Sequence, residues 1–379
     1  MNYKTIQIED LGVTVAYASF CPEGGVREWH VMLHVEPRSE AFEGQLRRIY
    51  DAEDRLPDMP GFEGAQYVLK RYFLSDSTNQ QPLMRQEEGV ALSCIQQQPL
   101  DGSKVVVWLY LESDVHIGKE QECIVAEHNG FRHLWRMSMT SSEGDSAQQT
   151  EAILNDYEQM LSRMGATLAE NCLRTWFFVR DVDTQYAGLV KARRENFVRE
   201  GLTPETHYIA STGIGGGPAE TKALVQMGAY AIVGLQPEQQ HYLYAKSHLN
   251  PTYEYGVTFE RGTLVEYGDR KHALISGTAS INNRGEVVHV GDIRLQTRRM
   301  WDNVEALLNE GGMDFGDVMH LVVYLRDIAD YAVVSEMFRE RFPDIPTVIT
   351  LAPVCRPTWL IEMECMAVKA NDNRNLRSF

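Results

Sequence analysis

Apolar residues dominate two short runs near the end of the chain, Val348–Ala352 and Leu360–Val368, and their composition predicts two β-strands. In the second run Glu362 and Glu364 lie two positions apart, so the period of two along a strand places both carboxylates on one face. A buried carboxylate without a partner is costly, so the pair needs an explanation. Either a cation such as Arg356 pairs with it, or one carboxyl stays protonated in an apolar pocket and serves as a general acid.

The same succession of elements occurs more than once along the chain. Arg180-Asp181 and Arg326-Asp327 each follow a strand-like run. A helical stretch with a Gln-Thr pair precedes each of them, Gln149-Thr150 in one case and Gln296-Thr297 in the other. A fainter copy places Asp76 after the run VLKRYFL. We interpret this order as an internal repeat of one structural unit.

The third copy shows the elements of the unit most clearly. A β-hairpin is expected around His272–Thr278, with a turn at Asn282–Gly285. A helix follows, because Asp292 can cap its start and apolar residues recur at helical spacing as far as Gly311-Gly312. A strand at Val318–Leu325, a second helix and two closing strands complete the copy. Each unit is therefore predicted as ββαβαββ, a mixed sheet covered on one face by two helices.

These patterns predict an α+β protein of three tandem units, residues 1–115, 116–240 and 241–370, with a polar tail over residues 371–379 that we expect to fray. The uncovered faces of the three sheets can pack together around a pseudo-threefold axis. The chain would then be an internal pseudo-trimer. We expect a monomer, because such a chain satisfies its own trimer interfaces.

Composition narrows the class of partner. The chain has 379 residues, of which 44% are hydrophobic and 23% charged, as in globular proteins. Its formal net charge of −17 argues against a nucleic-acid partner, although a local pair of arginines can still hold a small anionic molecule. No apolar run is long enough to span a membrane, and the start has no signal-peptide segment. The six scattered cysteines indicate reduced thiols, no metal site and a cytoplasmic location.

Five short motifs, in this order, give the chain a family resemblance. They are Arg174-Thr175-Trp176, the glycine-rich run 210–216, the run SGTASI at 276–281, His289 before Gly291-Asp292, and Cys355-Arg356 with Leu360–Glu364. With them the chain resembles the YjgF/RidA (endoribonuclease L-PSP) superfamily, and within it most closely the chorismatases. The resemblance covers roughly residues 134–370. It implies RidA-like (chorismate-mutase-like) units, which usually form homotrimers with pockets between neighbours, and it places the family's catalytic carboxylate at Glu362.

Glu362 is the leading candidate for a catalytic residue. Alignment of the repeats places Gln226 and Val107 at the corresponding positions, so the acid occurs in one copy of three. One functional pocket is therefore expected instead of three. The competing interpretation of Glu362 is a structural ion pair. Glu364, whose counterpart is Gly228, is a weaker candidate for contact with a ligand.

Several other residues suit a ligand that carries carboxylates. Arg356 occurs only in the third copy and can bind a carboxylate, although it can also form a salt bridge to Glu362 at the rim. Cys355 is expected to line the pocket and not to act as a nucleophile, because no histidine lies nearby in sequence. Arg174 and Trp176 alternate along a strand, where they suit a planar anionic ring or form a packed sheet face.

The glycine-rich segment 211–217, STGIGGG, is a further candidate. Its first residues, Ser211, Thr212 and Gly213, are expected to contact the ligand, since successive N–H groups can hold an anion. A turn between two strands would require the same glycines. Tyr208, just before the segment, can line the same pocket.

Three functions fit these residues. The first is a chorismatase-like enzyme that removes pyruvate from chorismate or a related enolpyruvyl cyclohexadiene carboxylate. It would need no cofactor, because Glu362 supplies the acid while Arg356 and Arg174 hold carboxylates. The second is a Rid-type hydrolase of enamines or imines. The third is a non-catalytic member of the superfamily that binds a small metabolite.

Overall fold

Three mixed β-sheets follow one another along the chain, and the computed structural model describes all of residues 1–379. The first sheet contains β1 (Asn2–Ile8), β2 (Val13–Phe20), β3 (Glu28–Val35), β4 (Gln66–Leu74), β5 (Ala91–Gln96) and β7 (Val105–Glu112). The second contains β8 (His116–Glu120), β9 (Cys123–His128), β10 (Phe131–Thr140), β11 (Cys172–Val179), β12 (Ala210–Gly215) and β13 (Val225–Val233). The third contains β14 (Gln240–Leu243), β15 (Gly262–Glu266), β16 (Arg270–Ala279), β17 (Val318–Leu325), β18 (Thr347–Leu351) and β19 (Ile361–Ala370), and it also receives β6 (Gln98–Pro99) from the first part of the chain.

Strand order is the same in all three sheets. Three antiparallel strands come first, the closing strand of the unit pairs with the third of them, and a parallel pair lies beyond it, as in the order β8-β9-β10-β13-β11-β12. The units are thus βββαβαββ, with one more leading strand than predicted. Leading edge strands such as β8 (HIGKE) are largely exposed and lack an alternating apolar pattern, which is why the sequence does not reveal them.

One predicted hairpin is placed differently. The partner of β16 is β15, which precedes it in the chain, and not a strand after Asn282–Gly285. That turn closes only an isolated bridge between Ile281 and Val287.

Helices cover the outer faces of the sheets. They are α1 (Phe42–Arg55), α2 (Ser77–Gln80), α3 (Ser146–Arg163), α4 (Leu168–Asn171), α5 (Val182–Arg199), α6 (Ile293–Glu310) and α7 (Tyr331–Arg341), with 3-10 turns at Leu56–Asp58, Gln81–Leu83, Pro237–Gln239, Thr252–Tyr255, Phe315–Asp317 and Ile328–Asp330. None of the helices is both long and apolar enough to cross a membrane.

The helix predicted after Asp292 is confirmed in α6. The Asp292 carboxylate accepts the N–H of Leu295 at 3.0 Å, which satisfies one of the free donors at the helix start. Gly311 follows the last helical residue, and Gly312 adopts a positive φ of 73°, which glycine tolerates without steric penalty.

A repeated glutamine contact supports the internal triplication. Gln45, Gln149 and Gln296 occupy the same position in the first turns of α1, α3 and α6. Each side-chain oxygen accepts the N–H of the residue just before the closing strand of its own unit, at 2.7, 2.7 and 3.0 Å. Asp76, Asp181 and Asp327 likewise each precede the helical segment that follows β4, β11 and β17. The predicted equivalence of the three aspartates is confirmed.

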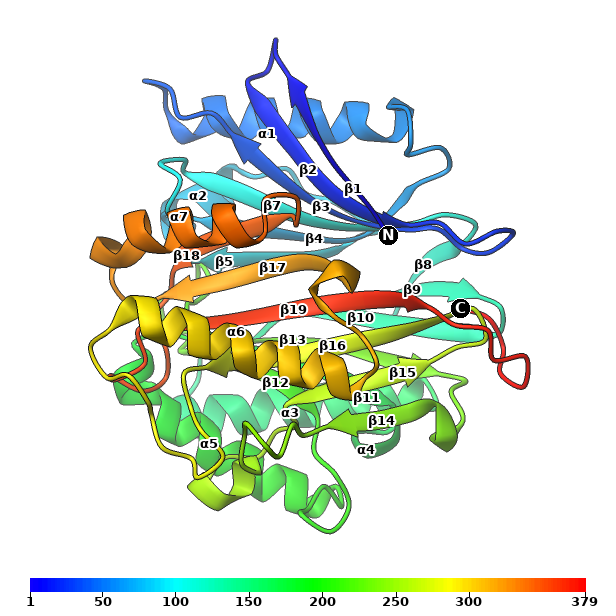
Figure 1. Ribbon diagram of the computed structural model, residues 1–379, viewed down its shortest axis with the longest axis vertical. Coiled ribbons are helices and arrows are strands. Elements are labelled where there is room, and N and C mark those ends of the chain that lie inside the picture. The colour runs from blue at the N-terminus through cyan, green and yellow to red at the C-terminus, as the bar shows by residue number, and fades with distance from the viewer.

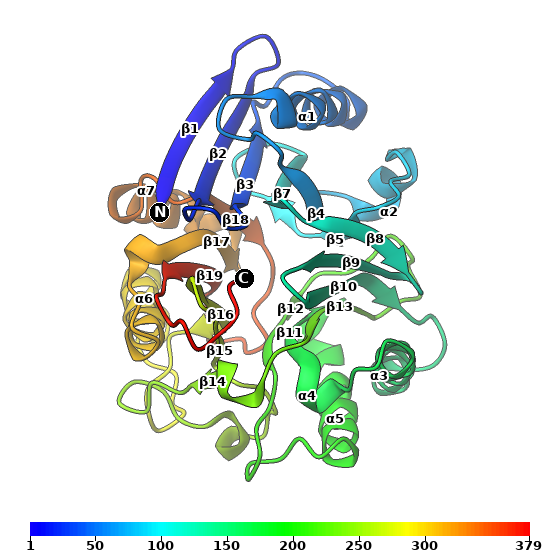
Figure 2. The same cartoon turned by 90° about the vertical axis from the view of Figure 1, so that its right-hand side faces the viewer.

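The three sheets turn their inner faces toward a common centre, and the longer helices lie on the outside (Figure 1; Figure 2). The largest apolar cluster combines side chains of all three sheets, among them Trp108, Trp176 and Met366. Smaller clusters fill the space between sheet and helices in the first and second parts of the chain. The predicted pseudo-trimer with sheet-to-sheet packing is confirmed.

The tail over residues 371–379 was expected to fray and instead packs. Phe379 is fully buried, with its ring 4.4 Å from that of His128 and 4.7 Å from that of His272, centroid to centroid. Arg377 donates to the carbonyl of Gly234 at 3.0 Å. The apolar ring of Phe379 is buried between the second and third sheets and so holds this polar segment in place.

Candidate active site

Glu362 is the second residue of β19, where it pairs with Tyr324 of β17 and Ala279 of β16. Its side chain is buried, with 5% of the residue exposed. No side chain or backbone group of the protein donates a hydrogen bond to the carboxyl, and no cation lies within 4.0 Å of it. The expected alternative, a salt bridge with Arg356, is therefore wrong.

The protonation state of Glu362 follows from these surroundings. Burial raises the pKa of the carboxyl, the nearby charge of Glu364 raises it further, and Arg174 and Arg261 oppose the shift; the result is a pKa of about 8. Glu362 is therefore mainly neutral at pH 7 and can donate a proton.

A bulge in β16 makes room for this carboxyl. The register between β16 and β19 shifts between Ile275 and Thr278, so Ser276 and Gly277 together face a single residue of β19. A Cβ on Gly277 would overlap Oε1 of Glu362. The carboxyl group thus occupies the space that any side chain at position 277 would need.

Glu364, two residues further on, has a different environment. Its Oε2 accepts from Nη2 of Arg174 at 2.8 Å and its Oε1 from Nε1 of Trp176 at 2.9 Å. Nη1 of Arg71, from the first sheet, lies 3.7 Å from Oε1. Glu364 is thus a buried anion paired with cations from two other sheets, at the centre of the pseudo-trimer.

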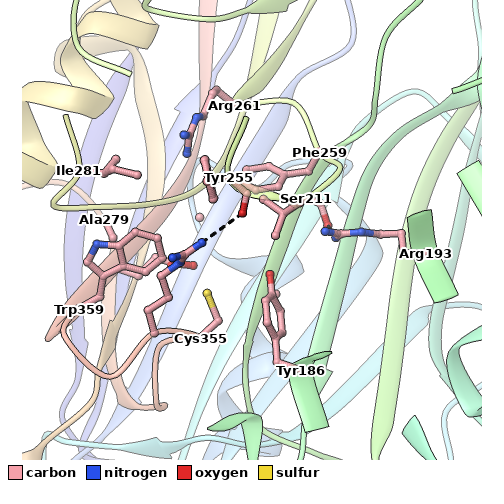
Figure 3. A pocket seen from close by; sticks show the side chains of 15 residues that line it. Tyr186, Arg193, Ser211, Tyr255, Phe259, Arg261, Ala279, Ile281, Cys355 and Trp359 are labelled. Atoms are coloured by element: carbon pink, nitrogen blue, oxygen red, sulfur yellow. Dashed lines mark hydrogen bonds between the residues drawn. The ribbon is translucent and has the colours of Figure 1, made fainter. Parts of the chain in front are cut away.

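The pocket at Glu362 lies between the second and third sheets (Figure 3). Its walls come from α5, β12, the segment between β14 and β15, β16 and the segment before β19: Tyr186, Arg193, Ser211, Gly213, Tyr255, Val257, Phe259, Arg261, Gly277, Ala279, Ile281, Cys355, Arg356, Trp359 and Glu362. Tyr186, Arg193 and Ser211 lie on one side and Trp359 on the other (Figure 3). The pocket combines an apolar lining with one acid and three arginines.

The structure brings together half of the predicted site residues. Glu362, Arg356, Cys355, Ser211 and Gly213 line the pocket. The expectation that the other residues line the same pocket is wrong: Arg174, Trp176, Thr212 and Glu364 form the buried network behind it, and Tyr208 lines a neighbouring cavity that shares Arg261.

The glycine-rich segment is neither an anion-binding loop nor a turn. Residues 210–215 form β12, which pairs in parallel with β11. The N–H of Gly215 bonds to the carbonyl of Pro353 at 2.9 Å, and that of Gly216 to the carbonyl of Val179 at 3.1 Å. These donors serve the contacts between strands and units, so they are not free to hold an anion.

Arg193 is a pocket residue that the sequence analysis missed. It is 1% exposed, and Nη1 donates to Oγ of Ser211 at 3.4 Å, while Nε and Nη2 have no partner in the protein. Burial lowers the pKa of this guanidinium. Tyr186 and Arg193 stand seven residues apart on α5, so helical spacing could have placed them on one face. Buried N–H donors without a partner indicate a place for an anionic ligand.

Two further arginines contact the segment between β14 and β15. Arg261 donates through Nη2 to the carbonyl of Asn250 at 3.0 Å, and Arg356 donates through Nη2 to that of Tyr255 at 3.4 Å. The Tyr255 ring lies 5.4 Å from the Arg261 guanidinium and 5.1 Å from that of Arg356. Both cations are thus held at the pocket wall without an acidic partner.

Cys355 remains a lining residue. Burial and the nearby Glu362 raise the pKa of its thiol to about 12, so the thiolate is scarce at neutral pH. This favours the predicted passive role of Cys355 over nucleophilic catalysis.

The acid has no equivalent in the other two units. Gln226 and Val106 occupy the second positions of β13 and β7, as Glu362 does in β19. The counterpart in the first unit is therefore Val106 and not Val107, because the alignment was one residue out of register. Gln226 donates to the carbonyl of Cys94 at 3.2 Å, so its amide is used structurally.

Glu362→Gln is expected to stabilise the protein at neutral and alkaline pH. The folded-state pKa of about 8 lies above the unfolded value near 4.5, so wild type loses stability as pH rises from 4.5 to 8. The increase in the free energy of unfolding caused by Glu362→Gln should be absent near pH 4 and reach roughly 3 kcal/mol at pH 7. Denaturant unfolding between pH 4 and 9 measures it, and a gain that does not vary with pH would contradict the assignment.

Comparisons with known proteins identify the family of the chain. A family model for endoribonuclease L-PSP matches residues 265–369, which include the bulge and Glu362. A RutC family protein of Pyrococcus abyssi is 39% identical over 87 residues, which make up 22% of this chain and 68% of that protein. The chain belongs to the endoribonuclease L-PSP family. Another relative in this family, the 3-aminoacrylate deaminase RutC of Acinetobacter baylyi, is 34% identical over 70 residues, or 18% of this chain and 56% of the relative.

A solved structure matches much more of the chain. The crystal structure of a chorismatase superposes with a TM-score of 0.65 over 82% of this chain and 95% of that chain, at 20% sequence identity. This endoribonuclease L-PSP family member therefore shares the fold of a chorismatase over 82% of its own length.

Proposed function

We propose that the protein is a chorismatase-like enzyme that removes pyruvate from chorismate or a related enolpyruvyl cyclohexadiene carboxylate. The observation that carries this proposal is a neutral glutamic acid, Glu362, in an apolar pocket that also holds three arginines. A proton donor beside cations suits a substrate that carries carboxylates and must be protonated on carbon. The fold shared with a chorismatase over 82% of the chain supports the same reaction.

In this proposal Glu362 gives its proton to the methylene carbon of the enol ether. The oxocarbenium ion that forms is captured by water or by the neighbouring ring hydroxyl. Pyruvate then leaves, together with a dihydroxycyclohexadiene acid or a hydroxybenzoate. The protein contributes an acid with a matched pKa and fixed positions for the reacting groups, and the reaction uses no cofactor.

The arginines hold the two carboxylates of such a substrate. Arg193 is the strongest candidate, because it is buried at the pocket wall with two N–H groups unpaired. Arg261 and Arg356 donate to uncharged oxygens, and they can exchange these contacts for a carboxylate, which binds a guanidinium more strongly.

Arg193→Met is expected to weaken binding more than it slows the chemical step. It removes a charge-assisted contact of roughly 1.5–3 kcal/mol, which corresponds to about 10- to 150-fold in affinity. Calorimetric titration with chorismate on the Glu362→Gln background avoids turnover. Arg194→Met, which changes the exposed neighbour on the same helix, is the matched control. Equal affinities for Arg193→Met and the control would remove Arg193 from the binding site.

The function is tested by incubating wild-type protein with chorismate and measuring pyruvate release. A second candidate, a Rid-type hydrolase of enamines, is favoured by the family-model match in the third unit and by the sequence similarity of the chain to RutC proteins. It predicts ammonia release from 3-aminoacrylate and no pyruvate from chorismate. Thermal stabilisation by a metabolite without any turnover would instead support a binding protein.

A further inference from the structure

Thr212 lies outside the pocket and yet contacts both structures that surround the Glu362 carboxyl. It belongs to β12 of the second sheet and is 1% exposed. Its Oγ1 accepts a hydrogen bond from Nη2 of Arg174 at 2.5 Å and another from the backbone N–H of Gly277 at 2.9 Å. One hydroxyl oxygen from the second unit therefore joins the buried ion-pair network to the bulge of the third unit.

The contact with Gly277 fixes the part of β16 against which Glu362 lies. The bulge takes Ser276 and Gly277 out of the regular ladder, so their positions depend on other partners. Ser276 Oγ accepts the N–H of Ser211 at 2.9 Å, and the next contact is that of Gly277 with Thr212. The Thr212 methyl also lies close to the position that a Cβ atom on Gly277 would occupy. The second unit thus holds two consecutive residues of the bulge.

Through its hydrogen bond with Arg174, Oγ1 of Thr212 also contacts the charged groups next to Glu362. The Nη2 atom of Arg174 that donates to Thr212 also donates to Glu364 at 2.8 Å. Glu364 in turn raises the pKa of Glu362, and Arg174 lowers it. A shift of Arg174 would change this balance of charge.

We propose that Thr212 is a positioning residue that holds the Glu362 carboxyl in its reactive orientation across the interface between the second and third units. The expected effect of Thr212 on the reaction rate rests on the proposed function. The expected effect of Thr212 on the titration of Glu362 does not, and it is measurable without any substrate.

The expected direction follows from the donors that Thr212 satisfies. Replacing its oxygen by a methyl leaves the N–H of Gly277 and an N–H of Arg174 without an acceptor beside the Glu362 carboxyl. Donors that turn to the carboxyl favour its charged form and lower its pKa. The other titratable or charged groups that face Glu362 keep their places: Glu364 on β19, Tyr324 on β17, Arg261 before β15, Tyr186 on α5, and Tyr255, Cys355 and Arg356 in the flanking segments.

The test compares Thr212→Val, which keeps the shape, with Thr212→Ser, which keeps the oxygen. Each change is made in wild type and in Glu362→Gln, and the unfolding free energy is measured from pH 4 to 9. The part of the unfolding free energy that depends on pH through Glu362 has a midpoint at the folded-state pKa of this carboxyl. Thr212→Val should lower that midpoint by roughly one pH unit, and Thr212→Ser should leave it unchanged. The Glu362→Gln background should show no such shift. Thr150→Val removes an equally buried threonine hydroxyl on α3 and is the matched control.

The same variants are then assayed with chorismate. Thr212→Val should lower kcat about 100-fold with little change in KM and should shift the alkaline limb of the pH profile to lower pH, and Thr212→Ser should restore most of the rate. If Thr212→Val does not fold, Thr212→Ala serves in its place. A loss of stability that is equal at every pH in both backgrounds, with kcat unchanged, would overturn the proposal. Absence of turnover in wild type would refute the proposed function, while the pH midpoint still decides the role of Thr212.

Discussion

Glu362→Gln is expected to lower kcat for pyruvate release from chorismate by about 10²–10⁴-fold, the usual contribution of general acid catalysis. The amide has the shape of the carboxyl but no proton to give to the enol ether. Binding should change little, because Glu362 is neutral in the pocket and the arginines hold the ligand charges. Steady-state kinetics of pyruvate release, together with calorimetric titration of the variant, measure both effects.

The matched control is Glu112→Gln. Glu112 is a fully buried glutamate whose pKa is also raised to about 8, mainly by burial, but it accepts from Tyr110 and lines none of the pocket. Its substitution should leave kcat unchanged. If Glu362→Gln retains the full rate while wild type releases pyruvate, the acid lies elsewhere in the pocket.

Gly277→Ala is expected to reduce kcat by about 100-fold, because the added methyl group overlaps Oε1 of Glu362 and displaces the carboxyl. A displacement of the catalytic carboxyl by about 1 Å is sufficient to lower kcat by this factor. The backbone of Gly277 does not have a positive φ, so the substitution introduces little strain of its own. The measurement is kcat with chorismate, accompanied by a thermal melt to verify folding.

Gly118→Ala provides the comparison for this substitution. Gly118 is also a strand glycine without a positive φ, and no atom lies within 4 Å of an added Cβ. Gly118→Ala should leave kcat with chorismate unchanged. Equal activities for the two alanine variants would show that the Glu362 carboxyl does not depend on the space at Gly277.

Local sequence signals predicted the regular elements well where one face of the element is buried. The helix from Asp292 and the strand Val318–Leu325 were recognised because capping, glycine and apolar spacing agree with one another. The leading strand β8 was missed because it lies at a sheet edge with most of its residues exposed. Burial of the tail through Phe379 depends on contacts with distant parts of the chain, which no local pattern reveals.

The two glutamates of β19 show how far the site could be predicted. Their spacing placed Glu362 and Glu364 on one face, but the difference between them comes from partners far away in sequence. Glu364 meets Arg174 and Trp176 of the second unit, and Glu362 meets only the bulge at Gly277 and the pocket. Arg193 was overlooked for the same reason, because only the docking of two units brings α5 to the pocket.

Glu362 is a neutral acid at physiological pH, and titration of its carboxyl is the most direct test of this protonation state. Wild-type protein labelled with ¹³C at the glutamate carboxyl carbons is followed by NMR from pH 4 to 9.5, and the spectrum of Glu362→Gln assigns the signal. The expected midpoint is about 8, because burial and Glu364 both oppose ionisation. A midpoint near the ~4.3 of a free glutamate would mean that Glu362 is ionised at pH 7 and would contradict its assignment as the proton donor.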